Sequence, residues 1–273
     1  MARTLGVVLA QISIGFDVTR NVATIREALD QARPGDVVLT PEGSVSGYPA
    51  RGEQDATMLD RIEAEEVEEG IDDLAAAAGQ ARAHLVVGAC LPEPIGLTNA
   101  ALVLTAEGQR HTYRKANLAD VERGRFVAGS DLTPIALRAA WGDLRVGVQI
   151  CRELRFPEQW ITLAYGGAEL FLHPANALEG AADRESWRSM LIARASELQR
   201  FVVSVNAAGP GQHSPTLAAD PRGRVKCELP PTMEAVRRVE VDLDEIGTGY
   251  LDQRRTDLTG RTEAPPPVRL EAR

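Results

Sequence analysis

The sequence predicts an α/β protein whose sheets contain both parallel and antiparallel strands. Short apolar runs rich in β-branched residues alternate with longer segments of helical periodicity, which is the order of elements in α/β proteins. Two of the short runs, 100–105 and 110–114, are joined by a turn containing Glu107-Gly108, which predicts an antiparallel hairpin. No repeat and no linker rich in Pro, Gly or Ser divides the chain, so we expect one domain over residues 1–258.

The expected elements begin with a strand at 4–10 and a helix at 18–32. This helix must end before Pro34-Gly35, because Pro and Gly together are a strong stop signal. The long helical segment 56–83 should break near Gly70, since glycine weakens a helix interior. The remaining strands are expected at 36–40, 84–90, 100–105, 110–114, 133–138, 144–150, 168–172, 201–206, 215–219, 223–227 and 235–241, and the remaining helices at 156–166 and 182–199.

The composition excludes several classes of protein. Thirty-nine acidic residues against 30 basic ones give a formal net charge of -9, which argues against binding to the phosphate backbone of nucleic acid. Hydrophobic residues at 44% and charged residues at 25% are ordinary values for a globular protein, so we expect a packed core. The tail 259–273 is polar and carries prolines at 265–267, and we expect it to be disordered or to form an arm across a subunit interface.

The sequence favours the cytoplasm as the compartment of this protein. Residues 1–17 contain only a short apolar run that Gln11 interrupts, so they are predicted to form a strand and not a signal peptide. The longest uncharged stretch, 201–219, contains Pro and Gly residues that a membrane helix would not carry. The three cysteines form no spaced framework, and an odd number cannot pair completely. A reducing compartment and no membrane association are therefore expected.

Three reactive side chains stand at or just beyond the C-terminal ends of expected strands: Glu42, Lys115 and Cys151. Such strand ends carry the active sites of many α/β folds, so a carboxylate, an ammonium and a thiol could converge. This trio suffices for acyl transfer, because the carboxylate can activate the thiol and the ammonium can stabilise an oxyanion. Lys115 is also one of only two lysines among 30 basic residues, which favours a role that arginine cannot fill.

Several ordered motifs surround these three residues. The segment 146–177 contains Cys151, an acidic residue two positions later, Phe156-Pro157-Glu158 and a strand that ends in Pro. Pro41-Glu42 precedes Gly47-Tyr48, and Tyr113-Arg114-Lys115 precedes Leu118. Further motifs are Trp187 through Asn206 and Asp220-Pro221 with Gly223. In all of them the sequence resembles the nitrilase, or carbon-nitrogen hydrolase, superfamily, from residue 4 to about residue 258.

The resemblance implies a four-layer αββα sandwich of the carbon-nitrogen hydrolase type. It implies Cys151 as the nucleophile, Glu42 as the general base and Lys115 as the cation that stabilises the oxyanion. A second glutamate that orients the lysine is implied at Glu122, with Asp120 as the less favoured candidate. The alternative for Glu122 is a surface ion pair with a nearby arginine.

Two departures from the resemblance lie beside the nucleophile. Arg152 stands where related enzymes have an aromatic or small residue, and its backbone N–H could complete an oxyanion hole. Its side chain is expected to pair with Glu153 or Glu158, or to face an anionic group of the substrate. Glu153 itself replaces the commoner Asp. Three further residues are expected near the substrate: Tyr48, His173 and Asn176.

The resemblance implies a hydrolase that cleaves a non-peptide carbon-nitrogen bond of a small carboxamide, as a homodimer or higher homo-oligomer. Hydrolysis of an N-carbamoyl compound is the second interpretation and nitrile hydrolysis the third. Two hypotheses of other classes stay open: a Cys-His enzyme that uses His173, and a catalytically silent binding scaffold. No histidine or cysteine pair has the spacing of a metal site, so no metal and no organic cofactor are expected.

Overall fold

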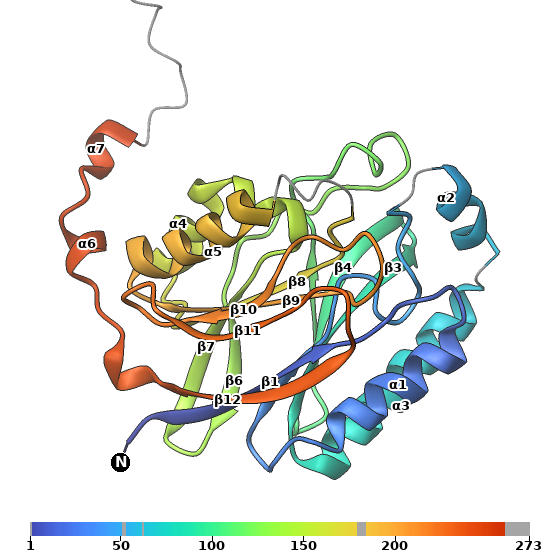
Figure 1. Cartoon of the computed structure of the whole chain (residues 1–273), viewed down its shortest axis with the longest axis horizontal. Coiled ribbons are helices and arrows are strands. Elements are labelled where there is room, and N and C mark those ends of the chain that lie inside the picture. The colour runs from blue at the N-terminus through green and yellow to red at the C-terminus, as the bar shows by residue number, and fades with distance from the viewer. Residues whose placement is uncertain (1, 51–52, 62, 179–183, 260–273) are drawn as a thin grey trace, which may run out of the picture.

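The structure is a computed structural model that describes residues 2–50, 53–61, 63–178 and 184–259. Its centre is a pair of six-stranded sheets that face each other, and helices cover both outer faces (Figure 1). The expected tail beyond Thr259 lies outside the described residues. None of the helices in the described ranges is long and apolar enough to cross a membrane.

The first sheet has the strand order β12-β1-β2-β3-β4-β5. Its strands are β1 (Thr4–Gln11), β2 (Val37–Leu39), β3 (His84–Glu93), β4 (Gly96–Leu104), β5 (Arg110–Arg114) and β12 (Ala235–Asp242). The neighbours β1, β2 and β3 run parallel, whereas β12, β4 and β5 join by antiparallel pairing. The sheet is therefore mixed, as the sequence predicts.

The second sheet has the order β11-β10-β9-β8-β7-β6. Its strands are β6 (Ile135–Ala139), β7 (Gly142–Val148), β8 (Leu170–Ala175), β9 (Phe201–Asn206), β10 (Thr216–Ala219) and β11 (Val225–Leu229). The pairs β7-β8 and β8-β9 are parallel, and the outer pairs are antiparallel. Each sheet thus has a parallel centre, whose strand ends can carry a site.

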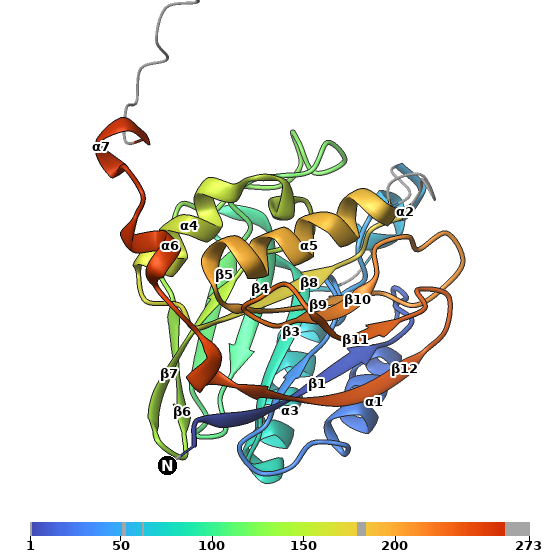
Figure 2. The ribbon, with the colours of Figure 1, turned by 60° about the vertical axis from the view of Figure 1, so that its left-hand side comes forward.

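The helices complete four layers (Figure 2). Helices α1 (Val18–Leu29) and α3 (Ala64–Ala81) cover the first sheet, and α4 (Pro157–Tyr165) and α5 (Arg184–Leu198) cover the second. The shorter elements are α2 (Glu53–Leu59), α6 (Gly249–Asp252), α7 (Thr256–Thr259) and the 3-10 turns η1 (Cys151–Arg155) and η3 (Leu243–Glu245). This αββα arrangement confirms the fold class implied by the resemblance.

Strand β1 explains why both faces of the first sheet are buried. Val7 and Leu9 belong to the core between the sheets, while Val8 and Ala10 belong to the core under α1 and α3. Successive side chains of a strand point to opposite faces, so a continuously apolar strand must be covered on both sides. The helical layers satisfy this requirement, and they fix the sheet rigidly below the loops at its end.

The predicted hairpin is confirmed, but the predicted helix break is wrong. Strands β4 and β5 pair across a turn in which Gly108 adopts φ +82°. The break in 56–83 lies between Leu59 and Ala64, and Gly70 lies inside α3. A Cβ added at Gly70 would lie 3.0 Å from Val22 and 3.1 Å from Val18, so this glycine lets α1 and α3 pack closely.

Candidate active site

The three reactive side chains meet where the two sheets face each other. Glu42 follows β2 and Lys115 follows β5, both in the first sheet, while Cys151 follows β7 in the second. All three residues are buried. A backbone hydrogen bond from the Glu42 N–H to the carbonyl of Ala175, 3.4 Å long, ties the Glu42 loop to β8 of the opposite sheet. The predicted convergence of the three strand ends is therefore present.

Lys115 joins two buried carboxylates. Its Nζ lies 2.8 Å from Oε1 of Glu42 and 2.9 Å from Oε1 of Glu122. Tyr48 donates its hydroxyl to the same oxygen of Glu122 at 3.1 Å, and the Lys115 Nζ lies 5.6 Å from the centroid of the Tyr48 ring. Glu122 is therefore a buried partner of the lysine and no surface partner of an arginine. Asp120 is exposed and contacts Arg123 and Arg152 instead.

Cys151 lies at a sharp turn in direct contact with Glu42. It adopts φ +47°, a left-handed conformation that costs a non-glycine residue about 1–2 kcal/mol. The thiol interacts electrostatically with the Glu42 carboxylate and with the backbone N–H of Asn176. The same Asn176 N–H lies 3.1 Å from Oε2 of Glu42. The turn thus projects the thiol toward the carboxylate that could take its proton.

Burial and charge set the resting protonation of this cluster. Burial raises the pKa of the Cys151 thiol, and the nearby Glu42 carboxylate raises it further. Burial also raises the pKa of Glu42, although Lys115 partly opposes this. Burial alone would lower the pKa of Lys115, but the charges of Glu42 and Glu122 outweigh burial and raise it. The cluster therefore favours a neutral thiol beside a basic carboxylate and a permanent ammonium.

Asn99 is a member of the cluster that the sequence analysis missed. Its side-chain Nδ2 donates to Oε1 of Glu42 at 2.7 Å and to Oε1 of Glu122 at 2.5 Å. It therefore relieves the repulsion between two carboxylates that share one lysine. The predicted hairpin places Asn99 next to Lys115, which could have indicated its role. In the structure Ala100 pairs with Arg114, and the Asn99 carbonyl accepts from the Lys115 N–H at 2.8 Å.

Glu153 connects the nucleophile turn to the lysine loop. Its Oε2 accepts the Ile150 N–H at 2.7 Å, and its Oε1 accepts the backbone N–H groups of Ala116 and Asn117 at 2.8 and 3.0 Å. The Tyr113 hydroxyl donates to both oxygens. Both oxygens of this buried carboxylate therefore have hydrogen-bond donors. The glutamate found here in place of Asp reaches both the nucleophile turn and the lysine loop. It fixes Lys115 and Cys151 relative to each other.

A small cavity opens above the thiol. Its volume is about 300 Å³, and Tyr48, Cys151, Asn176, Trp187 and His213 are among the residues that line it. A cavity of this size is at the lower end of the range for small-molecule sites. Tyr48 and Asn176 line this cavity, and their contact with a substrate stays a prediction.

The side chain of Arg152 lies at the rim of this cavity. Its Nη2 is 3.2 Å from Oδ2 of Asp120, and the exposed fraction is 37% for the Arg152 side chain and 69% for the Asp120 side chain. The predicted pairing with Glu153 or Glu158 is wrong, because Glu153 is occupied inside the protein by backbone N–H groups and Tyr113. An exposed ion pair of this kind contributes about 0–1 kcal/mol to stability.

His173 is buried next to Cys151 but does not face the thiol. Its Nε2 lies 2.9 Å from the Cys151 backbone carbonyl oxygen, and its Nδ1 lies 2.8 Å from the Ser204 hydroxyl. Burial lowers the pKa of this histidine to about 4. Both ring nitrogens are therefore engaged away from the sulfur, and the Cys-His hypothesis loses its base.

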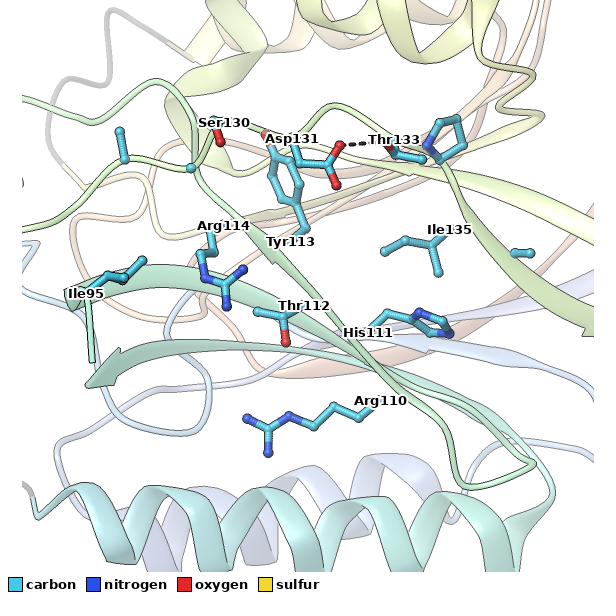
Figure 3. Close-up of a pocket in the computed structure, with 14 residues that line it drawn as sticks. Ile95, Arg110, His111, Thr112, Tyr113, Arg114, Ser130, Asp131, Thr133 and Ile135 are labelled. Carbon is cyan, nitrogen blue, oxygen red and sulfur yellow. Dashed lines mark hydrogen bonds between the residues drawn. The ribbon is translucent and has the colours of Figure 1, made fainter. Parts of the chain in front are cut away.

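A larger cavity lies elsewhere, at the edge where β5 and β6 leave the sandwich open (Figure 3). Its volume is about 600 Å³, and it is lined by Arg110, Thr112, Arg114 and Ile135 among others. None of Glu42, Lys115 and Cys151 lines it. Over the described ranges of the chain, no group of three or more His, Cys, Asp or Glu residues could hold a metal ion.

Gly88 provides a test of how strand β3 positions the loop that carries Glu42. A Cβ at this position would lie 2.4 Å from the Gly43 nitrogen and 2.8 Å from the Glu42 Cα, because β3 passes directly under the loop. We expect Gly88→Ala to displace Glu42, lowering kcat at least about tenfold and stability by about 1–3 kcal/mol. Steady-state kinetics and thermal unfolding measure the two effects. The control is Gly79→Ala in α3, where the added methyl would have the carbonyl oxygen of Ala106 as its nearest neighbour outside the helix, at 3.9 Å. Unchanged kcat in Gly88→Ala would contradict the expected displacement of Glu42.

Comparison with known proteins defines the class to which this site belongs. The sequence matches the carbon-nitrogen hydrolase family over residues 6–249. It is 30% identical to an (R)-stereoselective amidase of a Pseudomonas species, over 86% of this chain and 85% of that protein. It is also 30% identical to a 2-oxoglutaramate amidase of Bacillus subtilis, over 79% of this chain and 81% of that protein. The chain therefore belongs to the carbon-nitrogen hydrolase family and is an enzyme of that class.

Solved structures share the same architecture. The crystal structure of an amidase from a Nesterenkonia species superposes with a TM-score of 0.77 at 24% sequence identity, covering 94% of this chain and 95% of that one. A variant of an amidase from Nesterenkonia sp. AN1 in complex with butyramide superposes with the same TM-score, over 94% of this chain and 96% of that one. At this level of identity the likeness establishes the common αββα fold.

Proposed function

We propose that this enzyme is an amidase that hydrolyses small linear carboxamides through a thioester on Cys151. The observation that carries the proposal is the contact of a buried thiol with a buried carboxylate, which a buried ammonium contacts in turn, at the floor of a cavity of about 300 Å³. The amidases among its relatives support the same reaction class. The size of the cavity favours a small substrate over a peptide.

The first half of the reaction forms the thioester. The Glu42 carboxylate takes the proton of the thiol, and the sulfur of Cys151 attacks the carbonyl carbon of the amide. Negative charge then develops on the carbonyl oxygen, where the Lys115 ammonium and the backbone N–H of Arg152 stabilise it. Glu42 returns the proton to the amide nitrogen as the carbon-nitrogen bond breaks, so ammonia or an amine leaves.

The second half restores the enzyme. Glu42 is again a carboxylate and removes a proton from a water molecule, which attacks the thioester carbon. The same oxyanion donors stabilise the second tetrahedral intermediate, and the thiol leaves with the proton that Glu42 held. In this mechanism Glu122, Tyr48 and Asn99 are positioning residues, because they hold Lys115 and Glu42 without touching the reacting atoms. The chain supplies every group that the reaction requires.

Intact-protein mass spectrometry with a panel of amides, ureido acids and nitriles tests this proposal. We expect wild type to gain the mass of the acyl group from amides and to release ammonia, and we expect Cys151→Ala to gain none. An adduct only with ureido acids or nitriles would replace the amidase by a carbamoyl hydrolase or a nitrilase. No adduct and no ammonia with any compound would favour the binding scaffold.

We further propose that the enzyme acts in the cytoplasm as a homodimer or higher homo-oligomer. Three cysteines without disulfide bonds support a reducing compartment. Exposed Tyr165 on α4 and Tyr250 on α6 support a contact between copies, since aromatic side chains are enriched at protein interfaces. Light scattering of the purified protein measures the oligomeric state, and a monomer at micromolar concentration would contradict this part of the proposal.

A further inference from the structure

The peptide unit between Cys151 and Arg152 has two ends with different surroundings. Its carbonyl belongs to Cys151, and its N–H belongs to Arg152, the group that the mechanism assigns to the oxyanion. A peptide unit is planar, and in this trans peptide the C=O and the N–H point in opposite directions. Whatever holds the carbonyl on one side of the turn therefore also aims the N–H on the other side.

His173 holds that carbonyl. Its Nε2 lies 2.9 Å from the Cys151 oxygen in a buried environment. A carbonyl oxygen can only accept, so Nε2 must carry the proton. The neutral ring then has its lone pair on Nδ1, which accepts the Ser204 hydroxyl hydrogen at 2.8 Å. The Cys151 carbonyl thus selects the tautomer, and the Ser204 hydroxyl, which can donate or accept, satisfies the other ring nitrogen.

Both residues of this pair are fully buried. His173 and Ser204 are register partners on the parallel strands β8 and β9. The His173 ring lies between two indoles, with centroid distances of 5.7 Å to Trp160 and 6.4 Å to Trp187. The low pKa of His173, about 4, keeps the ring neutral near pH 7. A ring held in this way can also maintain the φ of +47° at Cys151, which is unfavourable on its own.

We propose that His173, protonated on Nε2 and hydrogen-bonded to the Cys151 carbonyl, is a positioning residue that orients the Cys151-Arg152 peptide so that the Arg152 N–H points at the developing oxyanion. The inference rests on the proposed amidase mechanism and adds to it the element that aligns one oxyanion donor. It assigns to His173 a role in acylation that is separate from the reactivity of the thiol. The two roles can therefore be measured independently.

The test compares two reactions of the same thiol in folded variants. Acylation by an amide substrate forms an oxyanion, whereas reaction of Cys151 with methyl methanethiosulfonate forms a disulfide and no oxyanion. In His173→Leu we expect acylation to slow about 100-fold, the effect of losing an oxyanion donor, with the disulfide reaction within about threefold of wild type. His173→Gln retains a side-chain N–H that can reach the carbonyl, and it should recover most of the loss.

Nitrogen NMR of the histidine rings tests the tautomer directly. It should show the Nε2-protonated form of His173 in wild type. The Nδ1-protonated form would overturn the inference, because that ring cannot donate to the Cys151 carbonyl. The matched control is His84→Leu. His84 is also buried, its Nε2 lies 3.0 Å from the Arg138 carbonyl and its Nδ1 accepts the Ala106 N–H at 3.2 Å, but it lies far from the cavity. Its loss should lower the melting temperature and leave the ratio of the two rates unchanged.

Three further results would overturn the role assigned to His173. Parallel slowing of both reactions in folded His173→Leu would overturn the inference, because His173 would then act on the thiol or on the whole turn. Unchanged acylation in His173→Leu would overturn it as well, while leaving the amidase proposal intact. Absence of acylation in wild type with every amide would overturn the amidase proposal and this inference together.

Discussion

Replacing Lys115 by Arg is expected to reduce kcat at least about 100-fold, although the positive charge is kept. The Lys115 ammonium is buried and lies within 2.9 Å of both Glu42 and Glu122. A guanidinium is a broad planar group, and this space holds a single compact donor that must also reach the oxyanion. Steady-state kinetics with the amide identified by mass spectrometry measures the effect, and KM should change less than kcat.

The chain contains a matched control for this substitution. Lys226, the second of its two lysines, is exposed on β11 in the second sheet. Lys226→Arg makes the same chemical change and should leave kcat and the melting temperature within error of wild type. Near-normal turnover in Lys115→Arg would show that the reaction does not require a compact ammonium. The scarcity of lysine in this chain would then no longer support a special role for Lys115.

Replacing Glu42 by Gln is expected to reduce kcat/KM by about 10²–10⁴-fold, because the amide cannot accept the thiol proton. Wild-type kcat/KM should rise with pH as Glu42 loses its proton. The apparent pKa of this rise should lie above the ordinary value for glutamate, since burial raises the pKa of Glu42. The remaining activity of Glu42→Gln should lack this acidic limb. Glu93→Gln, which removes a carboxylate paired with Arg114, should keep the wild-type profile.

Stability separates loss of chemistry from loss of folding in this variant. Burial raises the pKa of Glu42, so the folded protein binds this proton more tightly than the unfolded chain does. The contribution of Glu42 to the free energy of folding therefore becomes less favourable as the pH rises from the ordinary glutamate pKa through the raised one. Glu42→Gln also removes one of the two carboxylates that pair with the buried Lys115, so we expect a lower melting temperature at pH 7 in a thermal scan, and the kinetics are compared below that temperature. An unchanged acidic limb in folded Glu42→Gln would contradict the assignment of Glu42 as the base.

The sequence by itself determined the class of this protein and the identity of its reactive groups. The order of apolar runs and helical segments predicted an α/β protein with mixed sheets, and the resemblance to the carbon-nitrogen hydrolases implied the four-layer sandwich. Residues at the ends of strands, Glu42, Lys115 and Cys151, were predictable because parallel strands bring their C-terminal ends to one edge of a sheet. The misplaced helix break at Gly70 shows the limit of local reasoning, since that glycine serves a contact with α1.

Only the tertiary structure decided how these groups are held. The roles of Asn99 and Glu153 depend on hydrogen bonds to residues between 36 and 57 positions away in the chain: Glu42 for Asn99, and Tyr113, Ala116 and Asn117 for Glu153. The direction of His173 was equally hidden, because a histidine at a strand end can face a thiol or a carbonyl. The register of β8 with β9 settles it by placing Ser204 beside the ring. Chemistry follows from residue identity, whereas orientation follows from packing across sheets.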